Sequence, residues 1–163
     1  MTTRFTATSA SRGFTLLELL IVVAIIGIIA AIAVGFLRAQ TDKAKVTAVA
    51  ADLRTFETGF LSYATDTGDF PPDSHLDGAY HLPPGTGVED YLPVQRWATP
   101  TPLGGSYNWE GPDNYSYAGV SVFLPTAPAS IFALLDKTID DGDLSQGKFR
   151  LTPNGRFTYI IDE

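Results

Sequence analysis

The chain has 163 residues, of which 45% are hydrophobic and 18% charged, a composition that fits one folded or singly anchored domain rather than a disordered chain. Its formal net charge is −7 and its basic residues are scattered, which argues against nucleic acid as a partner because phosphate binding needs clustered lysine and arginine. The chain contains no cysteine, which excludes disulfides, thiolate metal sites and a cysteine nucleophile.

The amino-terminal region carries one long apolar segment. Residues 1–12 are polar and small, whereas the segment from Phe14 to Leu37 is apolar apart from Glu18 and a few small or hydroxyl residues. The uncharged part of this segment, from Leu19 to Leu37, would span about 28 Å as a helix, close to the roughly 30 Å hydrocarbon core of a bilayer. We therefore expect a single membrane-spanning helix.

The charge beside this segment predicts its orientation. Arg12 precedes the apolar run, and basic residues on that flank keep the amino terminus in the cytoplasm while the rest of the chain is exported. An ordinary secretory signal peptide is the alternative, with an A-x-A-like cleavage site at residues 30–33. Because the apolar pattern continues past this point to Leu37, we favour a retained anchor in the inner membrane, with the remainder in the periplasm.

The residues at the start of the apolar segment carry a family resemblance. Gly13 is followed by the stretch FTLLE, residues 14–18, and then by the apolar helix. This pattern resembles the class III leader of type IV pilins and type II secretion pseudopilins. The resemblance implies that residues 1–13 are a leader, that a prepilin peptidase cuts between Gly13 and Phe14, and that Phe14 becomes the methylated amino terminus. It also implies that residues 14–37 are kept as a transmembrane and filament-core helix.

Glu18 is the one acid inside the apolar segment. An ionisable group at membrane depth is costly and is usually functional, with a partner that can be named. The resemblance implies that this partner is the amino group of Phe14 on a neighbouring subunit, so that Glu18 sets the register of assembly. The alternative is an acid at headgroup level, because four residues of helix reach only about 6 Å inward.

The helix is expected to continue beyond the membrane segment as an amphipathic half, residues 38–66. No proline occurs before Pro71, so we expect helix from Phe14 to about Thr65. Apolar residues recur at spacings of three and four, which predicts one buried stripe. These residues are Val46, Val49, Leu53, Phe56, Phe60 and Tyr63. Glycine and two prolines at positions 68–72 end the helical pattern.

Residues 67–163 are expected to form a globular head. A long proline-containing stretch from Asp73 to Gly105 predicts irregular loops. Aromatic and β-branched runs predict two hairpins and a short helix capped by Ser130. The expected strands are Tyr107–Glu110, Tyr115–Leu124, Lys148–Leu151 and Phe157–Ile161, and the expected helix is Ser130–Ile139. A long helix packed against an antiparallel sheet of about four strands gives an α+β, pilin-like fold.

Two further motifs in the head resemble those of major pseudopilins, with departures. Gly68-Asp69-Phe70-Pro71 resembles a GxYP signature in which phenylalanine replaces tyrosine. The segments Tyr91-Leu92-Pro93 and 101–107 resemble an LP…PWGxxY signature, with Pro102-Leu103-Gly104 in place of PWG. The match supports the family more than a particular subtype.

No pattern of catalytic residues is present, and we expect the protein not to be an enzyme. The sequence lacks GxSxG, HExxH and phosphate-binding glycine loops. His75, Asp77 and His81 lie close in sequence and could bind a metal, although solvated loop residues are the simpler interpretation.

An acidic cluster in the late part of the chain is a candidate calcium site. Asp140, Asp141 and Asp143 surround Gly142 and offer the hard oxygen ligands that Ca²⁺ prefers. The resemblance also implies calcium in an acidic loop of this region. However, the spacing is not that of an EF-hand, and the alternative is an acidic turn that ends the preceding helix.

Two classes of function follow. In the first, the chain is a structural subunit of a type II secretion pseudopilus or pilus-like helical filament. The resemblance implies prepilin peptidase, an inner-membrane assembly platform with its ATPase, and minor pseudopilins as partners. In the second, it is a membrane-tethered or secreted binding domain. Cleavage after Gly13 distinguishes them, because a tether needs no cut there.

Overall fold

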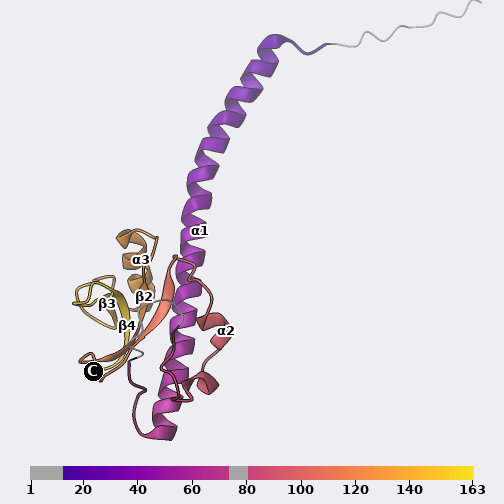
Figure 1. The fold of residues 1–163 in the computed structure, drawn as a ribbon. Coiled ribbons are helices and arrows are strands. Elements are labelled where there is room, and N and C mark those ends of the chain that lie inside the picture. The colour runs from indigo at the N-terminus through magenta and orange to yellow at the C-terminus, as the bar shows by residue number, and fades with distance from the viewer. Residues whose placement is uncertain (1–12, 74–80) are drawn as a thin grey trace, which may run out of the picture. The chain divides into compact units, whose positions relative to one another are not determined.

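The computed structural model describes residues 13–73 and 81–163 (Figure 1). The chain divides into two compact units, residues 1–40 and 41–163, and each unit is described by itself. The long helix α1, Leu16–Thr67, contributes to both. It begins and ends two residues later than the sequence predicts.

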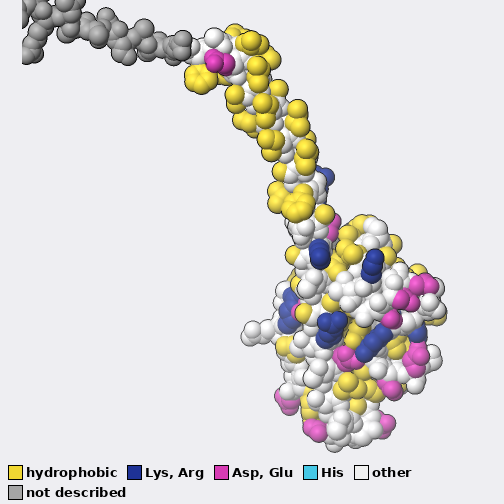
Figure 2. Space-filling view, turned by 180° about the vertical axis from the view of Figure 1, so that it is seen from behind, with side chains coloured by type: hydrophobic (Ala, Val, Ile, Leu, Met, Phe, Trp, Pro, Cys, Tyr) yellow, Lys and Arg dark blue, Asp and Glu magenta, His cyan; other side chains and the backbone are white. Residues whose placement is uncertain are grey.

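In the first unit, the apolar part of α1 exposes its side chains on all sides. Hydrophobic side chains cover its surface (Figure 2), and those of Ile21, Val23, Ile28 and Ile32 are each about half exposed or more. Within the described residues, α1 is the one helix long and apolar enough to cross a membrane. An apolar surface of this extent needs lipid or protein to cover it.

In the second unit, α1 buries one stripe against the head. The predicted stripe from Val46 to Tyr63 is buried at every position, and Ala50 and Gly59 complete it. At Gly59 the helix comes so close to the following segment that an added Cβ would lie 2.6 Å from the carbonyl oxygen of Tyr91. Glycine therefore allows the helix and this segment to pack directly on one another.

The head contains a four-stranded antiparallel sheet and one helix. The strands are β1 (Ser106–Glu110), β2 (Ala118–Phe123), β3 (Phe149–Leu151) and β4 (Phe157–Asp162), and the helix is α3 (Ala129–Ile139). The strand order is β1-β2-β4-β3, so each predicted hairpin forms and β2 joins them by pairing with β4. The predicted α+β fold is confirmed. The second strand begins at Ala118 rather than Tyr115, because residues 111–117 form turns and bends.

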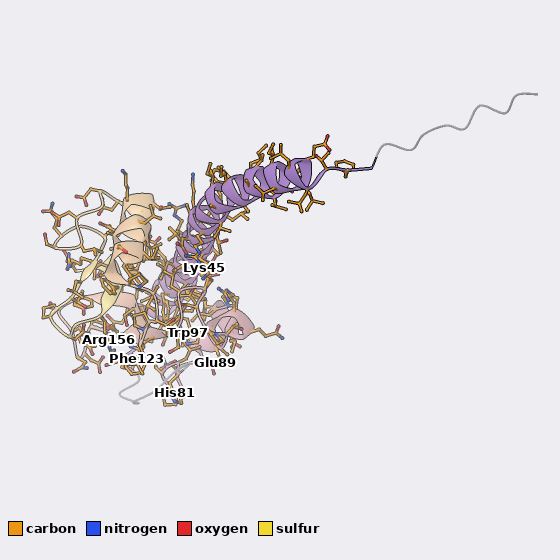
Figure 3. All side chains as sticks on the ribbon, turned by 90° about the horizontal axis from the view of Figure 1, so that it is seen from above. Lys45, His81, Glu89, Trp97, Phe123 and Arg156 are labelled. Carbon is orange, nitrogen blue, oxygen red and sulfur yellow. The ribbon has the colours of Figure 1, made fainter. Side chains whose placement is uncertain are left out.

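The stretch between α1 and β1 is less irregular than the sequence predicts. It contains a 3₁₀ turn η1 (Val88–Tyr91) and a short helix α2 (Val94–Trp97). Trp97 is fully buried and lies among the side chains of the core (Figure 3). Its ring meets that of Phe56 edge-on, with the ring centroids 4.9 Å apart. The buried tryptophan thus holds this segment against α1. Residues 74–80 lie outside the described part.

An aromatic cluster joins α1 to the sheet. The rings of Phe60 and Trp109 stack with centroids 3.7 Å apart, and Phe56 meets Tyr107 edge-on at 4.8 Å. Trp109 also donates its indole N–H to the carbonyl oxygen of Pro71, at 3.0 Å. Aromatic pairs of this kind add to the free energy gained from burial alone.

Candidate functional site

The predicted assembly residues lie together at the start of α1. Gly13 and Phe14 are exposed and precede the helix, and Glu18 lies in its first turn. One carboxylate oxygen of Glu18 accepts the backbone N–H and the hydroxyl of Thr15, both at 2.9 Å. In return the Thr15 hydroxyl oxygen accepts the Glu18 N–H at 3.2 Å. This reciprocal pair is a capping box, in which two otherwise unpaired backbone donors are satisfied.

The sequence interpretation missed this local role of Glu18. The spacing Thr15-x-x-Glu18 ahead of an apolar run is the signal of a capping box, and it could have been recognised. Within one chain the glutamate therefore stabilises the start of its own helix. Its pairing with Phe14 of another subunit stays a prediction.

Asp52 joins α1 to α2 and β1. Its carboxylate accepts two guanidinium N–H groups of Arg96, with the Nε–Oδ1 distance 2.8 Å, and the Tyr107 hydroxyl at 2.6 Å. Burial, and then the hydrogen bond to Asp52, raise the pKa of Tyr107. The hydrogen bond to Asp52 also raises the pKa of Arg96. The Arg96 guanidinium therefore stays charged, and the Tyr107 phenol stays protonated, across the physiological range.

Glu57 joins the other flank of α1 to β4. Its carboxylate forms an ion pair with Lys148, whose Nζ lies 2.6 Å from Oε1, and accepts the Tyr159 hydroxyl at 2.7 Å. The hydrogen bond to Glu57 raises the pKa of Lys148. No sequence signal points to these contacts, because their partners lie 91 and 102 residues away along the chain.

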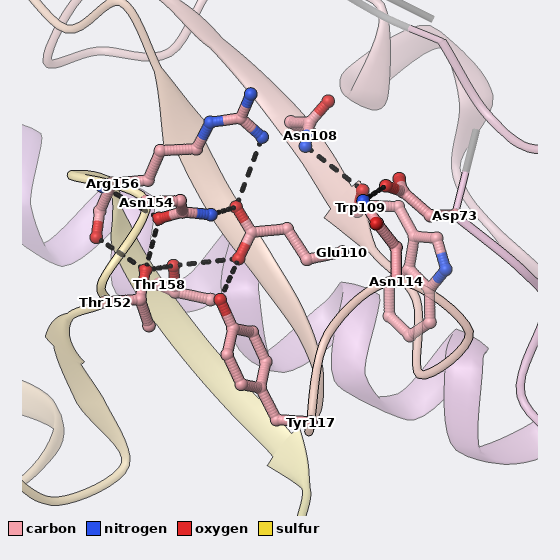
Figure 4. A network of polar contacts seen from close by, with 10 residues as sticks. All are labelled: Asp73, Asn108, Trp109, Glu110, Asn114, Tyr117, Thr152, Asn154, Arg156 and Thr158. Carbon is pink, nitrogen blue, oxygen red and sulfur yellow. Dashed lines mark hydrogen bonds and ion pairs between the residues drawn. The ribbon is translucent and has the colours of Figure 1, made fainter. Parts of the chain in front are cut away.

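Glu110 is a fully buried carboxylate at the end of β1. It accepts hydrogen bonds from Tyr117 at 2.8 Å, Asn154 at 2.9 Å, Thr158 at 3.1 Å and Arg156 at 3.2 Å (Figure 4). Arg156 also covers the ring of Phe123 at 4.9 Å, beside which it lies in Figure 3.

The four donors satisfy the Glu110 carboxylate, which is what a buried charge requires to be tolerated. Burial in turn raises the pKa of Tyr117. The donors come from the β1–β2 connection and from the second hairpin, so Glu110 ties the two halves of the sheet together. Both carboxylate oxygens of Glu110 therefore have donors.

The candidate calcium ligands lie in the exposed loop between α3 and β3. Asp140 accepts the Lys148 N–H at 2.7 Å, Asp141 accepts the Asp143 N–H at 2.7 Å, and Asp143 accepts the Ser145 N–H at 3.1 Å. Each carboxylate therefore bonds to a backbone donor of its own loop. In the described part of the chain, no group of three acidic or histidine side chains is arranged to hold a metal ion.

Calcium binding therefore stays a prediction, and each of the three carboxylates keeps a second oxygen that accepts none of these bonds. A calcium-dependent rise in unfolding temperature that is absent from Asp141→Asn would support it. His75 and Asp77 of the alternative metal hypothesis lie outside the described residues.

Asp136, which the sequence interpretation did not single out, lies beside this loop. Its side chain is fully buried, and neither carboxylate oxygen accepts a bond of ordinary hydrogen-bond geometry in the described structure. Burial, and then the charges of Asp141 and Asp140, raise its pKa to about 6, and the nearby Gly142 N–H partly opposes this increase. A buried carboxylate of this kind favours its protonated form.

Comparison with known protein families supports the interpretation of both units. Residues 8–34 match the family described as the prokaryotic N-terminal methylation motif. Residues 40–120 match the family described as PilW, C-terminal. The first match covers the predicted cleavage point and Glu18. The second covers the amphipathic half of α1, the following segment, β1 and the start of β2.

Three curated relatives carry the description "Type II secretion system core protein G". The protein of Pseudomonas aeruginosa is 32% identical over 98 residues, which cover 54% of this chain and 69% of the relative. That of Klebsiella michiganensis is 31% identical over 110 residues, covering 65% and 78%. The Escherichia coli protein is 30% identical over 105 residues, covering 64% and 63%.

Among solved structures, the major type IV pilin PilA1 from Clostridium difficile has a similar fold. The TM-score is 0.51 at 21% sequence identity, and the match covers 75% of this chain and 97% of that one. At this identity the likeness concerns the fold alone.

Proposed function

The chain belongs to the pseudopilin family that includes core protein G of type II secretion systems, and from this membership we propose that it is a subunit of a pseudopilus-like filament supporting protein secretion. The observation that carries the proposal is the methylation motif at residues 8–34, which leads directly into the exposed apolar part of α1. A helix whose apolar side chains are exposed on all sides is suited first to lipid and then to packing against other copies.

The chain is a single-pass, membrane-anchored protein, given its one apolar helix and its family. We propose that the amino terminus faces the cytoplasm and that the head lies in the periplasm. Arg12 before the apolar segment supports this orientation. The head is acidic, with thirteen acidic residues against five basic ones from Thr67 onward, which suits a soluble exported surface.

Processing at Gly13 is the first step of the proposed pathway. A prepilin peptidase would cut before Phe14, whose side chain is 82% exposed, and the new amino group would become methylated. The charge of this amino group would then meet Glu18 of a neighbouring copy, so that a subunit in the wrong register leaves both charges unpaired. An assembly platform with its ATPase and minor pseudopilins would complete the machinery.

The proposed role is structural rather than catalytic. The buried carboxylate Glu110 is saturated by its donors, and Asp52 and Glu57 are each engaged in ion pairs. Asp52 and Glu57 hold α1 to the head, and Glu110 holds the two halves of the sheet together, which suits a subunit that bears load.

Intact mass and amino-terminal sequencing of the membrane-extracted protein test the proposal. Cells with and without prepilin peptidase should differ, giving methylated Phe14 in the first case and the uncut chain in the second. A product that retains Met1 in both, or one that begins after Ala33, would contradict the filament function and leave a tethered or secreted domain.

A further inference from the structure

Two exposed lysines lie at the start of the second unit, next to the partly buried Asp42. Lys43 and Lys45 lie at the start of its helical segment, are exposed, and form no ion pair within the described structure. The four bases that do form ion pairs there are Arg96, Lys148, Arg150 and Arg156. The two lysines are thus left available for a partner outside the chain.

The opposite end of the same helical segment is acidic. A hollow of about 530 Å³ lies there, lined by Ala64 of α1, by Gly68 just after the helix, and by Phe70. Three carboxylates, those of Asp69, Asp113 and Asp162, line it too, and none of its described lining residues is basic. Figure 2 shows acidic side chains bordering this lower end of the unit, with basic ones higher along α1.

The two charged ends are too far apart to meet within one chain. Lys43 and Thr67 are separated by 24 residues of helix, or about 36 Å. Identical subunits that face the same way along an open filament contact one another through two different, complementary surfaces. Translation along α1 would bring the lysine end of one copy against the acidic end of another.

We propose that Lys43 and Lys45 of one copy bind the acidic hollow of a second copy, with Asp69 and Asp162 as their main partners. This contact rests on the proposed filament function and adds to it a heterologous interface between the second units of neighbouring copies, with the lysine end of one against the acidic end of the next. Exposed ion pairs are individually weak, but they repeat at every subunit and disfavour registers in which like charges meet. The apolar parts of α1 would hold neighbouring subunits together. The charged ends would set how far one subunit is displaced from the next along the filament axis.

Charge reversal tests this interface in cells that assemble the wild-type filament. Lys43→Glu with Lys45→Glu should reduce the filaments recovered by pelleting by about tenfold, and adding Asp69→Lys and Asp162→Lys should restore most of them. The matched control is Arg54→Glu with Lys137→Glu, which changes the net charge equally at two exposed bases away from both ends. This control should assemble normally. Full assembly of the lysine variant, or equal loss in the control, would overturn the proposal.

Crosslinking provides a second readout that does not depend on filament yield. Because the chain has no cysteine, Ala44→Cys and Thr65→Cys place single thiols near the two ends of the helical segment. A short bis-maleimide should convert the double variant into a ladder of multimers, whereas each single variant should give no ladder. Absence of the ladder in filaments that form normally would reject the interface while leaving the filament function intact. Failure of the wild-type chain to be cleaved or to polymerise would instead reject the proposed function.

Discussion

Thr15 and Glu18 cap the first turn of α1 through hydrogen bonds in both directions. The same carboxylate is the group predicted to pair with the amino group of Phe14 in another copy. The glutamate thus has one role that needs only a hydrogen-bond acceptor and another that needs a negative charge.

Glu18→Gln separates these two roles. Glutamine can take the same place in a capping box, so the helix should begin as before, but the charge for Phe14 is lost. We expect cleavage after Gly13 to continue and pelletable filaments to disappear. Thr15→Ala should do the reverse, costing about 1 kcal/mol at the helix start while filaments persist. Normal filaments in Glu18→Gln would show that charge pairing is not required.

Replacement of Arg96 by leucine should loosen the contact between α1 and α2. Asp52 would keep the Tyr107 hydroxyl but lose both guanidinium donors, and we expect the free energy of unfolding to fall by about 1 to 2 kcal/mol. Urea unfolding of the full chain in detergent measures the change. Arg54→Leu, at an exposed position without an ion pair in the described structure, is the control and should stay within about 0.5 kcal/mol of wild type.

Glu110→Gln should be among the most destabilising isosteric changes in the head. The side-chain amide of glutamine would place its own N–H donors where four donors already point. Arg156 would also lose the negative charge that it pairs with. A cost of about 3 kcal/mol is expected, with a clear fall in unfolding temperature. Glu89→Gln makes the same chemical change at an exposed carboxylate and should leave that temperature nearly unchanged. Equal effects from the two variants would rule out a special role for the buried network.

Asp136 should make the stability of the head depend on pH between about 4 and 6. Its pKa is about 6 in the folded chain and about 3.9 when unfolded, so the folded state binds this proton more tightly. The contribution of Asp136 to the free energy of unfolding is therefore most favourable below about pH 4. It falls as the pH rises to about 6 and does not change further at higher pH. The urea unfolding midpoint of Asp136→Asn should be higher than that of wild type at pH 7.5 but not at pH 4.5. A constant difference between the two chains would contradict the raised pKa.

Periodicity predicted the elements that bury a continuous surface. The stripe from Val46 to Tyr63 was identified because each turn of α1 places an apolar residue on the same face, and the antiparallel sheet followed from its short aromatic and β-branched runs. The capping box was also readable, since its two residues lie three positions apart. These features are local, and a local pattern is sufficient to predict them.

The features that the sequence did not predict depend on distant residues. Trp97 turns a proline-containing loop into the helix α2 because it fits beside Phe56, about forty positions earlier. The donors of Glu110 lie up to 48 residues away, and none of them resembles a motif. Asp136 looks like an ordinary surface acid of a helix until the fold buries it. Tertiary packing decides each of these cases.

Two of the carboxylates of α1, those of Asp52 and Glu57, together restrain how the helix can turn. Asp52 holds the helix on one flank through α2 and β1, and Glu57 holds it on the other through Lys148 and β4. Rolling the helix about its own axis in either direction would stretch one of these attachments. Within the second unit, torque applied to residues 41–67 therefore passes directly to the sheet, and the helix and the sheet turn as one body.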